Sequence, residues 1–191
     1  MDSVLILSTN INVTSVDEVA RLLQEKESTT LAVCNTNTLV RSHKNKVLQD
    51  KINAFDIRVP DGFPVAKASS ILYKNKQKRV DGYNIFHKTI EKGIKNNLTH
   101  YFFGSDEVII SKLKSKLLSR YPNINILGHF CPPFLNYDDL VSNEFVNELI
   151  EKAPDIVWVS LGFPKQEEFI DLLLKKRNIE SNFAAIGAVF E

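Results

Sequence analysis

Apolar and polar positions alternate in blocks along the chain, and these blocks predict strands and helices in turn. A short run of apolar residues is typical of a buried strand, whereas apolar residues three and four positions apart are typical of an amphipathic helix. Strands are predicted at residues 3–8, 29–34, 55–59, 99–103, 125–127, 155–160 and 183–190. Helical spacing is found around residues 15–23, 39–52, 65–73, 84–95, 108–118, 138–152 and 164–174.

Several predicted strands are apolar or small at every inner position, as in residues 155–160. Such strands are expected where helices cover both faces of a sheet. The order of elements predicts an α/β fold with a doubly wound, mostly parallel sheet and helices on both faces. The 191 residues are 43% apolar and show no internal repeat or linker, so one domain over residues 1–191 is expected.

Charge and cysteine content weigh against several classes of protein. The formal net charge is +1 with mixed signs along the chain, which argues against a nucleic-acid-binding protein. Cys34 and Cys131 lie far apart without a CxxC motif, and the four histidines lack metal-ligand spacing, so neither a disulfide framework nor a metal site is expected. Cys34 ends an apolar run and is expected to be a buried thiol. No apolar run approaches the roughly 20 residues that span a bilayer, and no signal peptide is recognisable, so a cytoplasmic location is expected.

Polar residues follow several predicted strands at the point where each strand ends. Ligands of a doubly wound sheet bind beyond the carboxyl ends of its strands, so these residues are expected to converge on one edge. Asp61 precedes Gly62, which permits close approach of a ligand, and its carboxylate can act as a general base toward a substrate hydroxyl. Asn35 and Asn37 can hydrogen-bond a sugar. For all three polar side chains the alternative is a cap on the following helix, and the local pattern favours that alternative.

Two glycine-containing turns and one arginine are further candidates for binding. Gly162 opens a turn in which Lys165 can neutralise a phosphate and Gln166 can contact a base or a sugar; an ordinary surface helix begun by a proline is the alternative. Gly104 precedes a helix N-terminus, which favours an anion, although acidic residues already occupy its first turn. Arg79 ends a basic run that predicts a loop, and its guanidinium can either bind a diphosphate or remain a solvated charge.

Several short motifs occur in an order that resembles the pattern of a known family. The motifs are Pro60-Asp61-Gly62, Arg79-Val80-x-Gly82, Phe102-Phe103-Gly104, Tyr121-Pro122, Pro154-Asp155-Ile156, Leu161-Gly162-x-Pro164-Lys165-Gln166-Glu167 and the final residues 186–191. In this order and spacing they resemble the WecG/TagA/CpsF glycosyltransferases (glycosyltransferase family 26), from about residue 31 to residue 191.

The resemblance implies a Rossmann-like core and an enzyme. Members of the family transfer a sugar from a UDP-sugar to an undecaprenyl-diphosphate-linked sugar, with inversion and without an essential metal or another cofactor. The donor sugar is of the N-acetylmannosamine type or glucose, and the products feed wall teichoic acid, enterobacterial common antigen, capsule or exopolysaccharide. The implied partners are the UDP-sugar, the polyprenyl-diphosphate-linked acceptor, the inner face of the bacterial cell membrane and possible further copies of the chain.

Two other functions are alternatives to this one. A nucleotide-sugar-binding protein with weak turnover is the alternative reading of the same motifs. A nucleotide-dependent dehydrogenase is disfavoured because no GxGxxG motif follows the first predicted strand.

The resemblance also assigns roles to residues of this sequence. Asp61 falls on the family's catalytic aspartate, and Asn35 and Asn37 fall on its Thr-x-Asn pair. The implied substrate-binding residues are Gly62, Arg79, Gly104, Gly162, Pro164, Lys165, Gln166 and Glu167. Among them, Arg79 is implied to lie near the diphosphate.

Three departures from the family pattern are visible. Asn35 replaces the usual threonine, and Asp81 and Asn84 replace the usual threonine and aspartate of the Arg-Val-Thr-Gly-x-Asp motif. These departures affect the expected choice of sugar more than the expected reaction. Family members usually continue with a basic C-terminal appendage that engages the membrane, so a form lacking it is expected to be weakly active.

Overall fold

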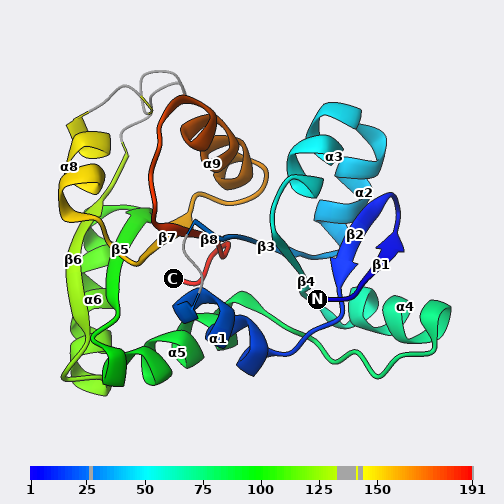
Figure 1. The fold of residues 1–191 in the computed structure, drawn as a ribbon, viewed down its shortest axis with the longest axis horizontal. Coiled ribbons are helices and arrows are strands. Elements are labelled where there is room, and N and C mark those ends of the chain that lie inside the picture. Colours follow the sequence, from blue (N-terminus) through cyan, green and yellow to red (C-terminus); the bar gives the residue numbers. More distant parts are fainter. Residues whose placement is uncertain (26–27, 133–140, 142–143, 191) are drawn as a thin grey trace.

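Six parallel strands form the central sheet of the computed structural model, which describes residues 1–25, 28–132, 141 and 144–190. The strand order is β4-β3-β8-β7-β5-β6 (Figure 1). The strands are β3 (Thr30–Cys34), β4 (Ile57–Pro60), β5 (Thr99–Gly104), β6 (Asn125–Phe130), β7 (Ile156–Ser160) and β8 (Asn182–Ala185). The predicted doubly wound, parallel α/β sheet is therefore confirmed.

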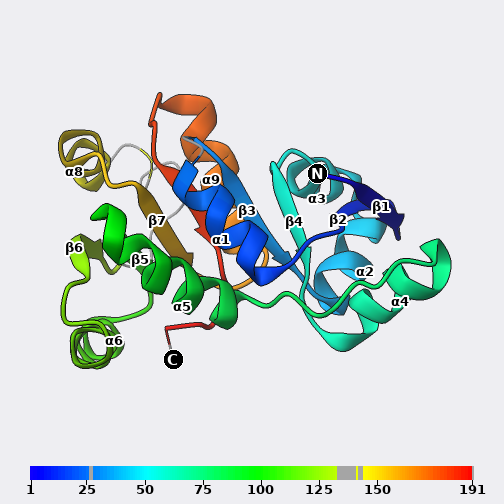
Figure 2. The ribbon, with the colours of Figure 1, turned by 60° about the horizontal axis from the view of Figure 1, so that its bottom comes forward.

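Helices cover both faces of this sheet and enclose two apolar cores. One face packs against α1 (Val16–Glu25), α5 (Gly82–Gly93) and α6 (Glu107–Arg120), and a 3-10 turn, η1 (Ile94–Asn96), follows α5. The other face packs against α2 (Thr36–Lys44), α3 (Lys46–Asn53), α8 (Glu144–Lys152) and α9 (Lys165–Lys176). Figure 2 shows α1 and α5 in contact across the first of these faces.

The N-terminal residues form a separate antiparallel hairpin, which the sequence pattern did not predict. The predicted strand at residues 3–8 ends earlier, as β1 (Ser3–Ile6), and pairs with β2 (Thr9–Asn12). Leu7 and Ser8 have φ values of 45° and 65°, so they make the two-residue turn that reverses the chain. The pattern missed β2 because its sequence, Thr-Asn-Ile-Asn, contains only one apolar residue.

Two other predicted elements need correction, and a third is described only in part. The predicted helix at residues 39–52 is two helices, because Asn45 adopts an extended conformation and its side chain accepts from the backbone N–H of Leu48 to cap α3. The predicted strand at 183–190 ends at Ala185, and Gly187 then takes a φ of +69° that turns the chain. The predicted helix at 138–152 is described only at Val141 and from Glu144 onward; its other residues lie outside the described part of the chain.

One further helix, α4 (Phe63–Tyr73), lies beside the hairpin at the β4 end of the sheet. The Tyr73 hydroxyl donates to the backbone oxygen of Leu5 at 2.7 Å, which joins the end of α4 to β1. None of the helices in the described part of the chain is long and apolar enough to cross a membrane.

Candidate active site

The carboxyl ends of β3 and β4 bring two of the predicted catalytic residues to the same edge of the sheet. Cys34 of β3 lies opposite Pro60 of β4, so Asn35 and Asp61 leave the sheet side by side. The backbone N–H of Asp61 donates to the oxygen of Cys34 at 3.0 Å, which fixes the start of the loop after β4. Cys34 itself is fully buried, as predicted.

Asp61 does not cap the following helix, so the interpretation that local sequence favoured is wrong. Helix α4 has Gly62 at its N-cap, with a φ of 89° and no side-chain capping hydrogen bond. The Asp61 carboxylate instead accepts from Arg79, with Oδ1 at 3.3 Å from Nε and 3.2 Å from Nη2. Burial raises the pKa of Asp61 above its usual value, and the hydrogen bond and charge of Arg79 oppose that rise. A half-buried carboxylate with a raised pKa suits a general base.

Arg79 is held next to Asp61 by the backbone of the segment that leads into α5. The N–H of Val80 donates to the oxygen of Pro60 at 3.1 Å, which sets this segment beside the end of β4. The Arg79 side chain is 58% exposed, and Nη1 of its guanidinium has no partner among the described residues. Arg79 is therefore not a free loop charge, and it can contact a ligand while it holds Asp61.

Asp81 and Asn84, which differ from the usual residues of the family motif, together form the N-terminal cap of α5. Asp81 Oδ1 accepts from the backbone N–H of Asn84 at 3.0 Å, and the Asn84 amide donates to Asp81 Oδ2 at 2.8 Å. A side chain at Gly82 would come within 2.8 Å of the backbone oxygen of Ile186. The glycine of this motif thus allows the start of α5 to pack against the loop after β8.

Asn35 has the capping role that the sequence pattern predicted for it. Its Oδ1 accepts from the N–H of Thr38 at 3.1 Å and caps α2. Its amide nitrogen makes no hydrogen bond within the described residues, and the side chain of Asn37 makes none either. Both residues are exposed; Asn35 lies beside Asp61, and Asn37 is in the first turn of α2. Their amide groups are therefore available to a ligand.

The turn between β7 and α9 lies on the same edge of the sheet. Two of its side chains that were predicted to bind substrate are buried. Helix α9 starts at Lys165, so Pro164 is the N-cap and not the first helical residue. Lys165 is exposed, whereas Gln166 and Glu167 are 1% and 0% exposed. The Arg41 guanidinium lies over the Phe163 ring, 5.0 Å from its centre, so this turn touches α2.

Gln166 and Glu167 form a buried polar pair beneath the site. Gln166 Oε1 accepts from the N–H of Gly187 at 3.1 Å, and its Nε2 donates to Glu167 Oε1 at 2.9 Å. Burial raises the pKa of Glu167 to about 7, and its Oε2 has no hydrogen-bond partner among the residues that the structure describes. Within the described residues, the Gln166 side chain thus holds the loop after β8 in place.

Two glycines that were predicted to bind substrate differ in the space around them. Gly104 has a φ of +118°, and a side chain there would overlap the backbone oxygen of Ser160, so the closeness of β7 requires glycine at this position. Gly162 has a φ of +74°, but no atom of the described residues lies within 4 Å of the position of a Cβ. Gly162 therefore lies open at the edge, and Gly104 is packed.

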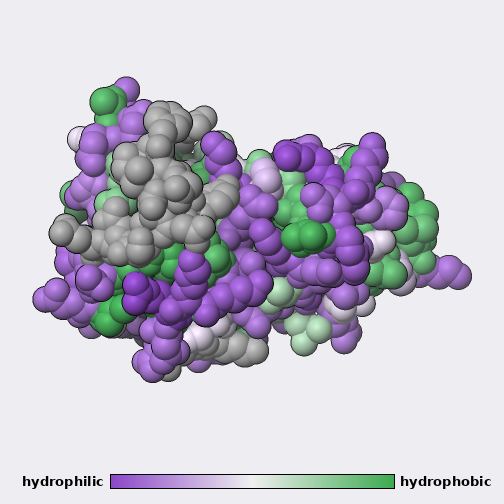
Figure 3. All heavy atoms as spheres, turned by 90° about the horizontal axis from the view of Figure 1, so that it is seen from above, coloured by the Kyte–Doolittle hydropathy of each residue, from purple (hydrophilic) through white to green (hydrophobic). Residues whose placement is uncertain are grey.

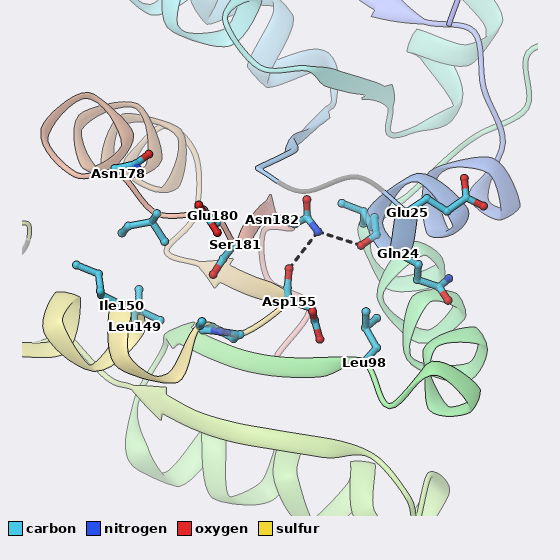
Figure 4. A pocket seen from close by; sticks show the side chains of 14 residues that line it. Gln24, Glu25, Leu98, Leu149, Ile150, Asp155, Asn178, Glu180, Ser181 and Asn182 are labelled. Atoms are coloured by element: carbon cyan, nitrogen blue, oxygen red, sulfur yellow. Dashed lines mark hydrogen bonds between the residues drawn. The ribbon is translucent and has the colours of Figure 1, made fainter.

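A pocket of about 440 Å³ lies at the opposite edge of the sheet, where β5, β7 and β8 begin (Figure 4). Part of its polar lining is used within the protein: the Asn182 amide donates to the backbone oxygens of Leu23 and Asp155 at 3.0 Å each. The Asp155 carboxylate accepts from both the N–H and the hydroxyl of Thr99. Ligands of such folds bind at the carboxyl edge, so we place the site at Asp61 and not in this pocket.

One group of possible metal ligands was missed by the sequence pattern. Glu107, His129 and Cys131 come together beyond the carboxyl end of β6, at the other end of the functional edge. The signal in the sequence is the spacing of His129 and Cys131, two positions apart. The third ligand, Glu107, comes from the start of α6.

Comparison with known proteins identifies the family of this chain. The model of the "Glycosyl transferase WecG/TagA/CpsF family" matches residues 4–191. An N-acetylglucosaminyldiphosphoundecaprenol N-acetyl-beta-D-mannosaminyltransferase of Bacillus subtilis (strain 168) is 27% identical over 163 residues, which are 84% of this chain and 62% of that protein. The protein of the same name from Bacillus spizizenii is 25% identical over 86% of this chain and 61% of its own length. The one from Staphylococcus aureus (strain NCTC 8325 / PS 47) is 30% identical over 62% of this chain and 45% of its own. The chain thus spans less than two thirds of the length of these relatives.

Proposed function

Because the chain belongs to the WecG/TagA/CpsF glycosyltransferase family, we propose that it carries the catalytic core of an inverting glycosyltransferase. The substrates are a UDP-sugar, with N-acetylmannosamine as the first candidate from the names of the relatives, and an undecaprenyl-diphosphate-linked sugar. The observation that carries the proposal is the Asp61–Arg79 pair, since it sets a half-buried carboxylate and an exposed cation at the ligand-binding edge.

In the proposed reaction Asp61 accepts the proton of the acceptor hydroxyl. The hydroxyl oxygen bonds to the anomeric carbon of the donor sugar from the face opposite UDP, and the bond from that carbon to the UDP oxygen breaks. UDP leaves with the electron pair of that bond, so the anomeric configuration inverts. Arg79 has two tasks: it keeps Asp61 ionised, and its remaining donors offset the charge of the leaving diphosphate, which in this proposal needs no metal ion.

The first test is release of UDP from a panel of UDP-sugars, with and without a synthetic prenyl-diphosphate-linked N-acetylglucosamine. Release from UDP-N-acetylmannosamine that requires the acceptor is the expected result. Tight binding of UDP without release from any donor would contradict transfer and favour the alternative, a nucleotide-sugar-binding protein.

The surface around α4 supports a contact with the membrane. Phe63, Ile71 and Leu72 are 72%, 64% and 64% exposed, and Leu5 and Leu7 of the hairpin are also exposed. Figure 3 shows apolar atoms at the end of the molecule that carries β1 and α4. We call this the α4 surface, and its members are Leu5, Leu7, Phe63, Ile71, Leu72 and Tyr73.

The charges in the segment that forms α4 and follows it have one sign. Residues 62–80 contain five cations and no acidic residue; the cations are Lys67, Lys74, Lys76, Lys78 and Arg79. Apolar side chains surrounded by lysines fit an anionic bilayer, in which the apolar groups enter the interface and the cations meet lipid phosphates. Since Asp61 and Gly62 directly precede α4, this contact would set the catalytic edge beside a lipid-linked acceptor.

The double variant Ile71→Asp and Leu72→Asp is expected to bind vesicles containing phosphatidylglycerol at least about tenfold more weakly than the unchanged chain, because two apolar groups are lost. Co-sedimentation measures the binding, and vesicles of phosphatidylcholine alone should bind less of either protein. Val108→Asp is the matched control, since Val108 is 62% exposed on α6, which lies on the opposite side of the molecule from α4 (Figure 1).

Two outcomes would contradict the membrane assignment. One is equal vesicle binding by the double variant and the control. The other is a concentration-dependent dimer, seen by light scattering, that only the double variant abolishes, because that would assign the α4 surface to a second copy of the chain.

A further inference from the structure

Three side chains of metal-binding type meet beyond the carboxyl end of β6. A carboxylate oxygen of Glu107, a ring nitrogen of His129 and the sulfur of Cys131 all lie within 4.8 Å of one another. His129 Nε2 is 3.1 Å from Glu107 Oε2. The group combines an oxygen, a nitrogen and a sulfur ligand at a single point.

The fold explains why these residues meet. His129 is in β6 and Cys131 follows two positions later, so their side chains leave the chain on the same side. Glu107 is the first residue of α6, whose start is fixed by Asp106: its Oδ1 accepts from the N–H of Ile109 at 2.8 Å. Because β5 pairs with β6, with Phe103 opposite Phe130, the helix that follows β5 begins beside the end of β6.

We propose that Glu107, His129 and Cys131 bind a divalent ion of the zinc class, with the fourth coordination position open to solvent. Bonds of about 2.0–2.3 Å in a tetrahedral zinc site set neighbouring ligand atoms about 3–4 Å apart, so small side-chain rotations complete the geometry. A sulfur and an imidazole ligand select Zn²⁺ over Mg²⁺ or Ca²⁺. The Glu107 side chain is 74% exposed and that of His129 is 27% exposed, so an ion reaches the site from solvent.

This site is separate from the proposed transfer chemistry. Asp61 follows β4 and Cys131 follows β6, and four strands lie between β4 and β6 in the sheet. The role of the ion is to join the end of an edge strand to the start of α6. Its binding is therefore measured without any transfer assay, and failure of one proposal leaves the other intact.

The test uses Co²⁺ as a probe of the folded protein. The expected result is one Co²⁺ per chain, with a thiolate-to-cobalt charge-transfer absorption that Zn²⁺ removes by displacement. Cys131→Ser should abolish the thiolate band. His129→Ala and Glu107→Gln should each weaken Zn²⁺ binding at least about tenfold, because changes to groups that only support a ligand already cost that much.

The chain offers matched controls for two of the ligands. Cys34 is the only other cysteine and is fully buried, so Cys34→Ala should keep the thiolate band. His43 is exposed on α2, and His43→Ala should leave Zn²⁺ affinity unchanged. Circular dichroism checks that each variant is folded. A folded unchanged chain without a thiolate band, or a band that survives in Cys131→Ser, would overturn the proposal.

Discussion

Asp61→Asn is expected to lower turnover by about 100-fold or more, because a general base contributes roughly that much to the rate. The amide has the size of the carboxylate and keeps an oxygen that can accept from Arg79, but it cannot take the proton of the acceptor hydroxyl. Turnover is measured as acceptor-dependent release of UDP, and binding of UDP is measured by calorimetry. UDP binding should change little.

The structure removes one competing explanation for such a loss. Asp61 makes no capping hydrogen bond to α4, so the substitution should not unravel that helix. Asp50→Asn is the control, since Asp50 is an exposed carboxylate on α3 that pairs only with Lys46. Normal turnover in Asp61→Asn would exclude Asp61 as the base.

The Asp61–Arg79 pair also predicts how activity depends on pH. Burial raises the pKa of Asp61, and the carboxyl must be ionised to accept a proton. Activity of the unchanged chain should therefore fall as pH is lowered through that pKa. The residual activity of Asp61→Asn should lack this fall.

Gly104→Ala is expected to lower the free energy of unfolding by about 3 kcal/mol or more, from a disfavoured φ combined with overlap against backbone. The added methyl group would collide with the backbone oxygen of Ser160, and neither strand can move without breaking the β5–β7 pairing. Urea unfolding followed by circular dichroism measures the change.

Gly162→Ala is the matched control for this prediction. Gly162 also has a positive φ, but no atom in the described part of the chain lies within 4 Å of the position of its Cβ. Its substitution should cost only the backbone strain, about 1–2 kcal/mol. An equal decrease in the free energy of unfolding in the two variants would show that the backbone near Gly104 moves to relieve the overlap.

The fold was largely predictable because buried parallel strands are continuous apolar runs. The sequence failed where local geometry decided the outcome. The polar strand β2 carries one apolar residue, and the break between α2 and α3 depends on the backbone of Asn45. Ala185 ends the last strand although apolar residues continue beyond it, because Gly187 turns the chain.

The candidate site was predictable in its residues but not in their partners. Asn35 and Asp61 both follow strands and precede helices, and the same rule predicted a cap for each. Asn35 leads directly into α2 and caps it, whereas Gly62, with its φ of 89°, separates Asp61 from α4. The local sequence predicted a solvated loop charge for Arg79. The backbone hydrogen bond from Val80 to Pro60 places Arg79 beside Asp61, and such a bond cannot be predicted from the sequence.

The position of β8 has a consequence for how the protein is made. Residues 182–185 form the last described strand in sequence, yet β8 lies between β3 and β7 in the middle of the sheet. While a ribosome is still translating these residues, β3–β4 and β7–β5–β6 are two unconnected groups, and β3 and β7 each expose a bare strand edge. The sheet is thus completed only after residues 182–185 have emerged, and until then the exposed edges of β3 and β7 can pair wrongly.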